Sequence, residues 1–358
     1  MLPAGNYYDR WMRSIPLTRS EKLRCAPFHL GTGADPIGSA GSYDAFLCVE
    51  VPLPWQHDIS EHEPYRSLAA TASIAGADRR SWRPQGLVPR GDTGGLTRVI
   101  AMEQPSQRDG MAGPYRRREW WVEPAQVLAL STALVGGDRR EVSSFDVDLV
   151  DVPDGVVDLF VCTHGRRDVC CGGMGTVLHG ALAEELAEDP TVRLWRVSHT
   201  GGHRFAPTAL TFPDGYGWAH LDLELALQLV RRDGPVGQLL DHCRGVSSLS
   251  GPAAQVADRE ALAANGWDWC RAHRTATTVD HDSDPGHDHE SDGDGDFGVD
   301  SVSDGGSVSE VELSGELVDH SSHHSKVLVE LAGWIPQPTC GVPLGDATAT
   351  APVWRVAQ

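Results

Sequence analysis

The sequence of 358 residues has few lysines, no long apolar run and no dense group of cysteines. Lys22 and Lys326 are the only lysines, against 28 arginines, which we interpret as a codon-composition bias. No stretch reaches 18 apolar residues, and the N-terminus lacks the apolar core of a secretion signal, so neither export nor a membrane partner is expected. The eight cysteines are too widely spread for a disulfide scaffold. We therefore expect a cytoplasmic protein whose thiols stay reduced.

Positive charge is missing from one long segment. No Lys or Arg occurs between Arg274 and Lys326, whereas 14 Asp and Glu occur from Asp280 to Asp319. The remaining chain carries 36 acidic against 30 basic residues, so its charge is nearly balanced and no nucleic-acid partner is expected. Residues 276–308 also have too few apolar side chains to offset chain entropy, which predicts a disordered acidic insert. Its stretch DGDGDFGVD resembles a calcium loop, but Phe297 occupies the glycine position, which favours a solvated linker.

Several catalytic signatures are also absent. The glycine-rich stretch at 31–41 does not follow a predicted strand, so it is not a dinucleotide-binding fingerprint. The CTH at 162–164 is half of a Rieske pattern, but no second half follows. No pair of carboxylates stands out as a glycosidase site. The sequence therefore favours an electron carrier or redox sensor over a stand-alone enzyme.

Four potential metal ligands are present as two pairs. Cys162 and Cys171 are separated by eight residues in CTHGRRDVCCG, and His199 and His203 by three residues in HTGGH. Two thiolates and two imidazoles are four ligands, the number needed by a tetrahedral metal or a two-iron cluster. The two glycines between the histidines predict a tight turn that lets both imidazoles converge.

The flanking residues predict how the two pairs meet. The apolar, β-branched run at 156–161 predicts a buried strand, GGMG opens a helix, and residues 192–197 form the next strand. The right-handed crossover of such a βαβ unit brings the loops after both strands to one edge of the sheet. Residues 209–212 and 216–220, joined by the turn PDG, predict an added antiparallel hairpin. The sum is a small thioredoxin-like core.

These residues resemble thioredoxin-like ferredoxins, in which two widely spaced cysteines are followed, a helix and a strand later, by Cys, three residues and Cys. His199 and His203 stand in for the last pair here, and that substitution is similar to the sucrase/ferredoxin-like family. The resemblance implies a [2Fe-2S] cluster ligated by Cys162, Cys171, His199 and His203, with the family spacing selecting Cys171 over Cys170. Further positions match this family: Cys25, Gly31-Thr32-Gly33, Trp55, Arg244-Gly245 and Gln255.

The predicted function is electron transfer or redox sensing through this cluster. Two neutral imidazoles in place of two thiolates remove two negative charges, which raises the reduction potential. Residues beside the ligands can assist, and these are His164, Arg166, Arg167, Cys170 and Arg204. With no nucleotide site predicted, a separate reductase or ferredoxin is the expected redox partner.

Two alternatives remain open. The same four ligands could close a structural zinc site with no redox role. A thiol oxidoreductase on a thioredoxin-like fold could use Cys170 or Cys171 with Cys162, although the C-x-x-C spacing usual for such enzymes is absent.

The predicted fold class is α/β with a mixed sheet. An N-terminal α/β domain, which we hypothesise to be a degenerate sibling of the cluster domain, precedes a thioredoxin-like ferredoxin domain. The predicted boundaries are 1–24 for an N-terminal arm, 25–150 for the N-terminal α/β domain, 151–275 for the ferredoxin domain, 276–308 for the acidic insert and 309–358 for a C-terminal hairpin and tail.

Overall fold

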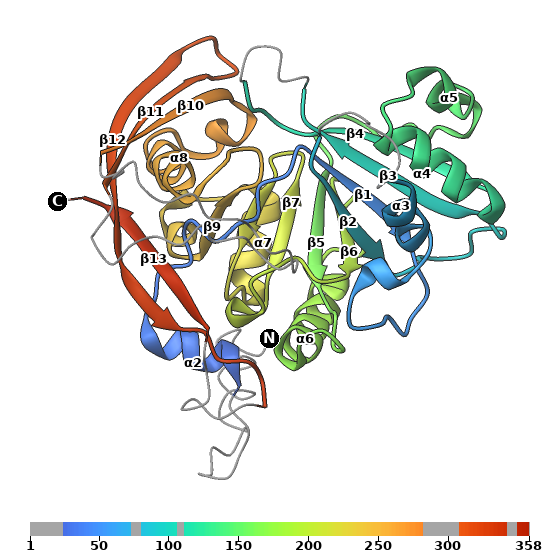
Figure 1. Ribbon diagram of the computed structural model, residues 1–358, viewed down its shortest axis with the longest axis horizontal. Helices are drawn as coiled ribbons and strands as arrows, with labels where there is room; N and C mark the ends of the chain where they lie inside the picture. Colours follow the sequence, from blue (N-terminus) through green and yellow to red (C-terminus); the bar gives the residue numbers. More distant parts are fainter. Residues whose placement is uncertain (1–23, 73–79, 106–110, 282–307, 342–348, 358) are drawn as a thin grey trace.

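The computed structural model describes residues 24–72, 80–105, 111–281, 308–341 and 349–357, and its class is mixed α/β, as predicted (Figure 1). The predicted N-terminal arm, except for Arg24, and residues 282–307 of the predicted insert lie outside the described residues. Within the described part of the chain, no helix has the length and apolar character needed to cross a bilayer. Two sheets, one of nine strands and one of four, organise the described residues.

The first half of the large sheet contains strands β1 (Ala45–Glu50), β2 (Trp82–Leu87), β3 (Thr97–Glu103) and β4 (Arg116–Val122). Strands β1 and β2 are parallel and are connected through helix α3 (Tyr65–Ala72), while β3 pairs antiparallel with β1 and β4 with β3. Helices α4 (Val127–Val135) and α5 (Arg139–Ser143) follow, and α3 and α4 cover apolar side chains of β1, β3 and β4.

The second half has the βαβ unit that the sequence predicts. Strands β5 (Val157–Cys162) and β6 (Val192–Val197) are parallel and are connected through helix α6 (Val169–Glu185). Strand β7 (Ala209–Phe212) pairs antiparallel with β5 and forms the predicted hairpin with β8 (Tyr216–Trp218). Helix α7 (Leu223–Arg231), strand β9 (Cys243–Val246) and helix α8 (Pro252–Asn265) complete this half.

The two halves share one sheet, in the order β4-β3-β1-β2-β6-β5-β7-β8-β9. Their junction is short: β2 and β6 have one register pair, Leu87 with Val197, flanked by backbone hydrogen bonds from Val88 to Arg196 and from Ser198 to Gly86. The halves face each other across a shared apolar cluster, which includes Phe46 and Ile100 from the first and Phe160 and Phe212 from the second. Strands on both sides of the predicted domain boundary at residue 150 therefore contribute to one core.

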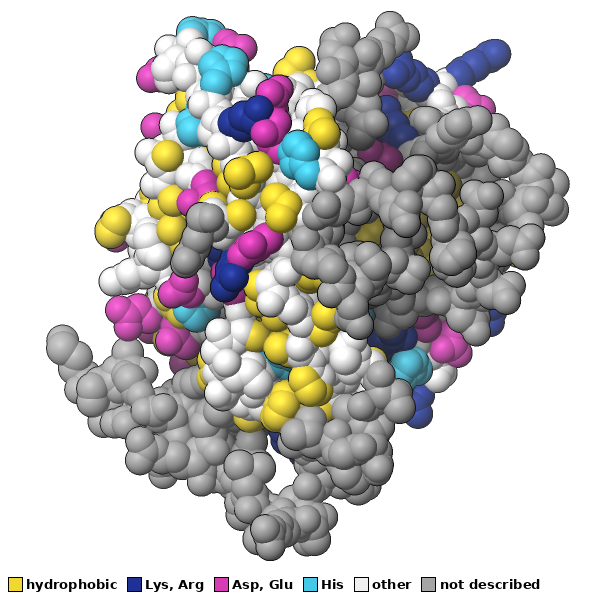
Figure 2. All heavy atoms as spheres, turned by 60° about the vertical axis from the view of Figure 1, so that its left-hand side comes forward, with side chains coloured by type: hydrophobic (Ala, Val, Ile, Leu, Met, Phe, Trp, Pro, Cys, Tyr) yellow, Lys and Arg dark blue, Asp and Glu magenta, His cyan; other side chains and the backbone are white. Residues whose placement is uncertain are grey.

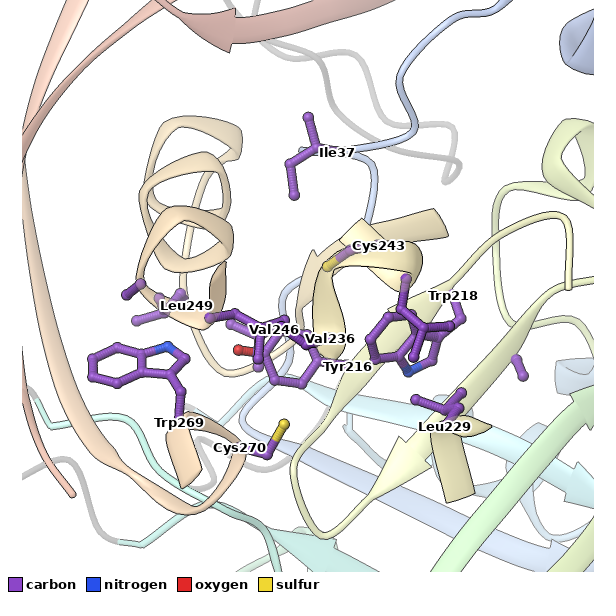
Figure 3. Close-up of a cluster of buried hydrophobic side chains, with 14 of the residues drawn as sticks. Ile37, Tyr216, Trp218, Leu229, Val236, Cys243, Val246, Leu249, Trp269 and Cys270 are labelled. Carbon is purple, nitrogen blue, oxygen red and sulfur yellow. The ribbon is translucent and has the colours of Figure 1, made fainter. Parts of the chain in front are cut away.

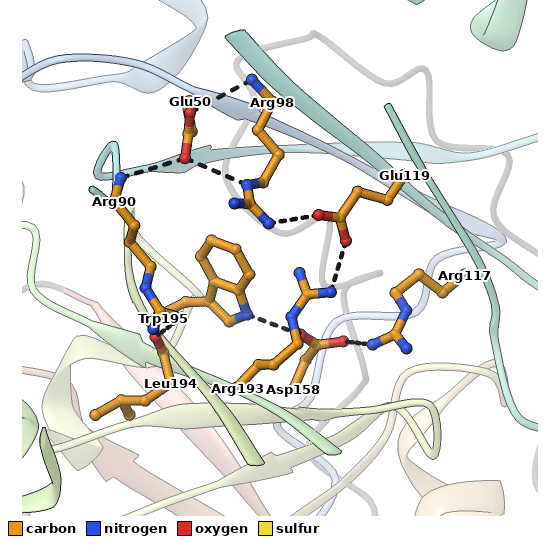
Figure 4. A network of polar contacts seen from close by, with 9 residues as sticks. All are labelled: Glu50, Arg90, Arg98, Arg117, Glu119, Asp158, Arg193, Leu194 and Trp195. Atoms are coloured by element: carbon orange, nitrogen blue, oxygen red, sulfur yellow. Dashed lines mark hydrogen bonds and ion pairs between the residues drawn. The ribbon is translucent and has the colours of Figure 1, made fainter. Parts of the chain in front are cut away.

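Ion pairs also cross between the halves (Figure 4). Glu119 on β4 accepts from Arg193 on β6 at 2.7 Å, and Arg117 on β4 pairs with Asp158 on β5. The carboxylates of Glu119 and Asp158 are almost completely buried, at 1% exposure each. Asp158 also accepts a hydrogen bond from the indole of Trp195 at 2.8 Å. Each buried acid therefore has at least two polar partners, as buried charges require.

The four-stranded sheet consists of β10 (His273–Asp280), β11 (Val308–Glu316), β12 (Ser322–Pro336) and β13 (Thr350–Val356), paired antiparallel in sequence order. Pairing of β11 with β12 confirms the hairpin expected near the C-terminus. Helix α8 lies between the two sheets, over a cluster that includes Tyr216, Val246 and Trp269 (Figure 3). The outer side of the small sheet mixes apolar, acidic and histidine side chains (Figure 2).

Four local details differ from the predictions. Residues 276–280 belong to β10, so this strand extends past the predicted start of the acidic insert. Strand β2 was not predicted, because Pro84 interrupts its pattern, and β13 lies in the segment that was predicted only as a tail. Helix α6 begins at Val169, before the GGMG that was expected to open it, because Asp168 caps it.

Candidate metal centre

Three of the four predicted ligands lie together. The sulfur atoms of Cys162 and Cys171 and a ring nitrogen of His199 all lie within 4.8 Å of one another. Cys162 ends β5, Cys171 lies in the first turn of α6, and His199 follows β6. Both cysteines are fully buried. The crossover therefore brings ligands from three consecutive elements to one end of the sheet, as the βαβ prediction requires.

The start of α6 presses closely on the end of β5. Asp168 caps the helix, because its Oδ1 accepts hydrogen bonds from the amides of Cys170 at 2.8 Å and Cys171 at 3.2 Å. A Cβ added to Gly175 would lie 1.9 Å from the carbonyl oxygen of Cys162, and one added to Gly172 would lie 2.3 Å from the Cα of Gly165. Glycine at these positions lets the two cysteine backbones approach.

The HTGGH turn takes the form that its glycines predict. Gly201 and Gly202 have φ values of 84° and 65°, a region that side-chain-bearing residues rarely adopt. The buried Arg244 holds this turn, since its guanidinium donates to the carbonyl of Gly201 at 3.0 Å. On the other side, Arg83 of β2 donates to the carbonyl of His199 at 2.9 Å. Two arginines therefore fix the backbone that presents the imidazoles.

His203 lies beside this group but is not within 4.8 Å of all three ligand atoms. Its ring centre is 6.2 Å from that of His199. Its Nδ1 lies 3.3 Å from Asp168 Oδ2 and 3.2 Å from Cys25 Sγ. With Nδ1 engaged in this way, Nε2 is the nitrogen available to a metal.

The two buried thiols at the centre shift each other's pKa in opposite directions. Their mutual hydrogen bond lowers the pKa of Cys162 and raises that of Cys171, and contact with His199 lowers the pKa of Cys162 further. Burial lowers the pKa of His199, which keeps this imidazole neutral. Its Nδ1 is buried and has no hydrogen-bond partner within the described part of the chain. A thiolate beside a neutral imidazole is the protonation state that metal ligands need.

A second group of thiols lies next to the first. The sulfur atoms of Cys25, Cys170 and Cys340 and an oxygen of Asp168 lie within 4.8 Å of one another. Cys340 Sγ is 3.3 Å from Cys170 Sγ and 3.3 Å from Cys25 Sγ. Hydrogen bonds from these two neighbours lower the pKa of Cys170 to about 4 and make it the thiolate of the group. Cys170 thus belongs to a different group from Cys171.

The other residues predicted beside the ligands support loops. His164 accepts from the amide of His199 at 3.3 Å and donates from Nε2 to the carbonyl of Gln56 at 2.7 Å, so both of its nitrogens are engaged. Arg166 donates to the side chain of Gln56, and Arg167 contacts the same loop. Arg204 stacks on the ring of Phe205 at 4.4 Å, and burial lowers its pKa to about 10.

Sequence reasoning missed several members of this region. It did not bring Cys25 and Cys340 together, because 315 residues separate them. Asp168 could have been predicted as the N-cap of α6, since an acidic residue two positions before a Cys pair at a helix start is typical of a cap. No comparable pattern pointed to Arg83, because the strand that carries it was not predicted. The remaining cysteines, Cys48, Cys243 and Cys270, are buried in apolar clusters, where a free cysteine acts as a small apolar side chain.

Comparisons with known proteins give a consistent picture. The family model described as sucrase/ferredoxin-like matches residues 36–245, more than half of the chain. The protein "Altered inheritance of mitochondria protein 32" of Meyerozyma guilliermondii is 33% identical over 78 residues, which are 21% of this chain and 27% of that protein. The chain therefore matches about a quarter of the length of this relative. No solved structure matches.

Proposed function

The chain belongs to the sucrase/ferredoxin-like family, and from this premise we propose that it is a redox protein that binds one [2Fe-2S] cluster through Cys162, Cys171, His199 and His203. The observation that carries the proposal is the convergence of the first three side chains at the end of the sheet, with His203 beside them. When bound, such a cluster supplies one-electron chemistry.

The spacing of the ligands favours two metal ions over one. A single tetrahedral ion with bonds of about 2.0 to 2.3 Å would draw all four ligand atoms to within about 4 Å of one another. His203 instead lies outside the group of three. A centre of two irons is wider than one ion and can accept a fourth ligand set apart in this way. This argues for the cluster and against the structural zinc alternative on these four residues.

The contact of His203 with Asp168 supports its role as a ligand. A metal-binding histidine usually donates its second ring N–H to a carboxylate, which fixes the tautomer and the orientation of the ring. Asp168 is 5% exposed and presents Oδ2 to His203 Nδ1 at 3.3 Å, while its Oδ1 caps α6. One carboxylate therefore orients an imidazole and positions the helix that carries Cys171.

The charges around the site favour an added electron. Two thiolates with two neutral imidazoles carry two fewer negative charges than four thiolates do. Arg83, Arg204 and Arg244 lie around the HTGGH turn, and Arg244 is 1% exposed. Buried positive charge stabilises a more negative centre. We propose electron transfer or redox sensing with a separate reductase or ferredoxin as partner, in the cytoplasm.

Analysis of anaerobically purified protein tests the proposal. We expect about two irons and two sulfides per chain, visible absorption, and an EPR signal after reduction with dithionite. Cys162→Ala and Cys171→Ala should remove all three signals, whereas Cys48→Ala, in the apolar core, should leave them unchanged. Colourless protein with one zinc at the same four ligands would overturn the proposal in favour of a structural metal. A disulfide between Cys162 and Cys170 or Cys171, with no iron, would instead indicate a thiol oxidoreductase.

Exchange of the imidazoles gives a finer test. His199→Cys and His203→Cys should keep a cluster, lower its potential by roughly 100 mV or more, and flatten the dependence of the potential on pH. The matched control is His179→Gln, on α6 outside the site. Redox titration monitored by EPR gives the potential, and an unchanged value in both variants would argue against imidazole ligation.

A further inference from the structure

The thiol group of Cys25, Cys170 and Cys340 is separate from the ligands of the proposed cluster. Its members come from α2 (Cys25–Thr32), from the first turn of α6 and from the loop after β12. We propose that these three cysteines and Asp168 bind a second metal ion, a single zinc(II), which ties both ends of the described chain to the helix beside the cluster.

The distances match one tetrahedral ion. Bonds of about 2.3 Å to sulfur and about 2.0 Å to oxygen place neighbouring ligands roughly 3.5 to 3.8 Å apart. Cys340 Sγ lies 3.3 Å from both other sulfur atoms, and Cys25 Sγ lies 3.6 Å from Asp168 Oδ2. All four ligand atoms lie within 4.8 Å of one another. This compactness contrasts with the wider set proposed for the cluster.

The surroundings are also those of a thiolate site. The amide of Cys25 donates to Cys340 Sγ at 3.4 Å, a contact that stabilises negative charge on sulfur. Cys25 and Cys170 are at most 1% exposed, and Cys340 is partly exposed, which provides an entry path for an ion. Zinc would displace the remaining thiol protons to solvent and bind without any change of oxidation state.

A disulfide is a weaker explanation of this group. It would join only two of the three thiols and leave the third beside Asp168. Disulfides are also uncommon in cytoplasmic proteins. Three thiols and a carboxylate converging from three distant segments are better explained by one soft ion that all four can bind.

The two sites would meet at His203 and Asp168. Asp168 Oδ2 faces both Cys25 and His203, and His203 Nδ1 faces Cys25 at 3.2 Å. Zinc on Asp168 would therefore alter the partner of a proposed cluster ligand. The zinc site would hold the C-terminal loop and α2 in place over the cluster, a structural role across 315 residues of chain.

Separate measurement of zinc and iron in the full-length protein tests this proposal. Protein produced with zinc and iron supplements and purified without oxygen should contain about one zinc per chain. Cys25→Ala and Cys340→Ala should each reduce zinc at least fivefold and leave iron and sulfide near the wild-type level. Cys162→Ala should do the reverse, and Cys243→Ala, in the apolar core, should change neither.

Two further variants keep the test decisive if an alanine variant folds poorly. Cys340→His keeps a metal-binding side chain at this position and should bind zinc, unlike Cys340→Ala. Cys340→Ser, whose side chain is similar in size to that of cysteine, should not bind it. Zinc without iron would leave this proposal standing and overturn the cluster. Iron without zinc, or zinc equally retained in Cys25→Ala and Cys340→Ala, would overturn this proposal alone. A Cys25–Cys340 or Cys170–Cys340 disulfide found by mass spectrometry of anaerobic protein would overturn it as well.

Discussion

The two halves of the large sheet have the same topology and different chemistry. In the first, a parallel β1-α3-β2 unit is followed by β3 and β4, in the order β2-β1-β3-β4. In the second, the parallel β5-α6-β6 unit is followed by β7 and β8, in the order β6-β5-β7-β8. This identity of order and direction supports the hypothesis that the N-terminal half is a sibling of the cluster half.

The positions that we propose as ligands in the second half correspond to supporting residues in the first. Strand β5 ends in Cys162, but β1 ends in Glu50, which pairs with Arg98. The loop after β1 supplies Gln56, whose carbonyl holds His164, and β2 supplies Arg83, which holds His199. The comparison teaches that this topology brings side chains together at the strand ends, and that their chemistry decides whether they form a candidate metal centre or support the neighbouring one.

Breaking the ion pairs between the halves should have the largest effect on stability. Glu119→Leu would remove one of the two buried carboxylates that Arg98 and Arg193 each contact, since Arg98 also pairs with Glu50 and Arg193 with Asp158, at a cost of about 3 kcal/mol in unfolding free energy. The exposed pair of Glu330 with Arg355 is the control, and Glu330→Leu should cost about 1 kcal/mol or less. Urea unfolding measures both. If both substitutions lowered the unfolding free energy equally, the two halves would be held together by the shared apolar cluster and not by these ion pairs.

Two glycines of α6, in the second half, differ in how closely their surroundings pack, and substituting each one tests this difference. Gly175→Ala would drive a methyl group into the carbonyl of Cys162, 1.9 Å away, and should cost about 3 kcal/mol as overpacking. Gly180 has nothing within 4 Å of the same position, so Gly180→Ala should be neutral or stabilise by up to about 1 kcal/mol. Thermal unfolding compares the two, and the prediction is wrong if both variants behave alike.

The buried His220 should make the stability of the second half sensitive to acid. Burial lowers the pKa of His220 from 6.5 to about 4, so the unfolded chain takes up a proton that the folded chain does not. The stability gained by keeping His220 neutral is fully present above pH 6.5. It is lost as the pH drops towards 4, which lowers the free energy of unfolding by up to about 3 kcal/mol. His220→Asn, which tolerates the φ of 49°, should flatten this decline.

His320 is the matched control for this experiment. It has a similar φ of 65° but is exposed in the turn between β11 and β12, so His320→Asn should leave the decline unchanged. Chemical denaturation between pH 4 and 7 provides the comparison. An equal slope in wild type and His220→Asn would assign the acid sensitivity to other groups.

Local patterns predicted most of the elements near the centre. The apolar runs predicted β5 and β6, the PDG turn predicted the β7–β8 hairpin, and HTGGH predicted its tight turn, because each is encoded by neighbouring residues. Patterns failed where the local signal conflicted with the fold, as at Pro84 in β2. They also could not reveal that the two halves face each other across one core.

The sequence by itself determined the identity and spacing of Cys162, Cys171, His199 and His203 and the crossover that brings their elements to one edge. Only the tertiary structure decided that Cys170 turns away from Cys171 to meet Cys25 and Cys340. The physical reason is that ligand spacing within a βαβ unit follows from short-range geometry. Contacts between α2, α6 and the C-terminal loop depend instead on how distant segments pack, which no local periodicity records.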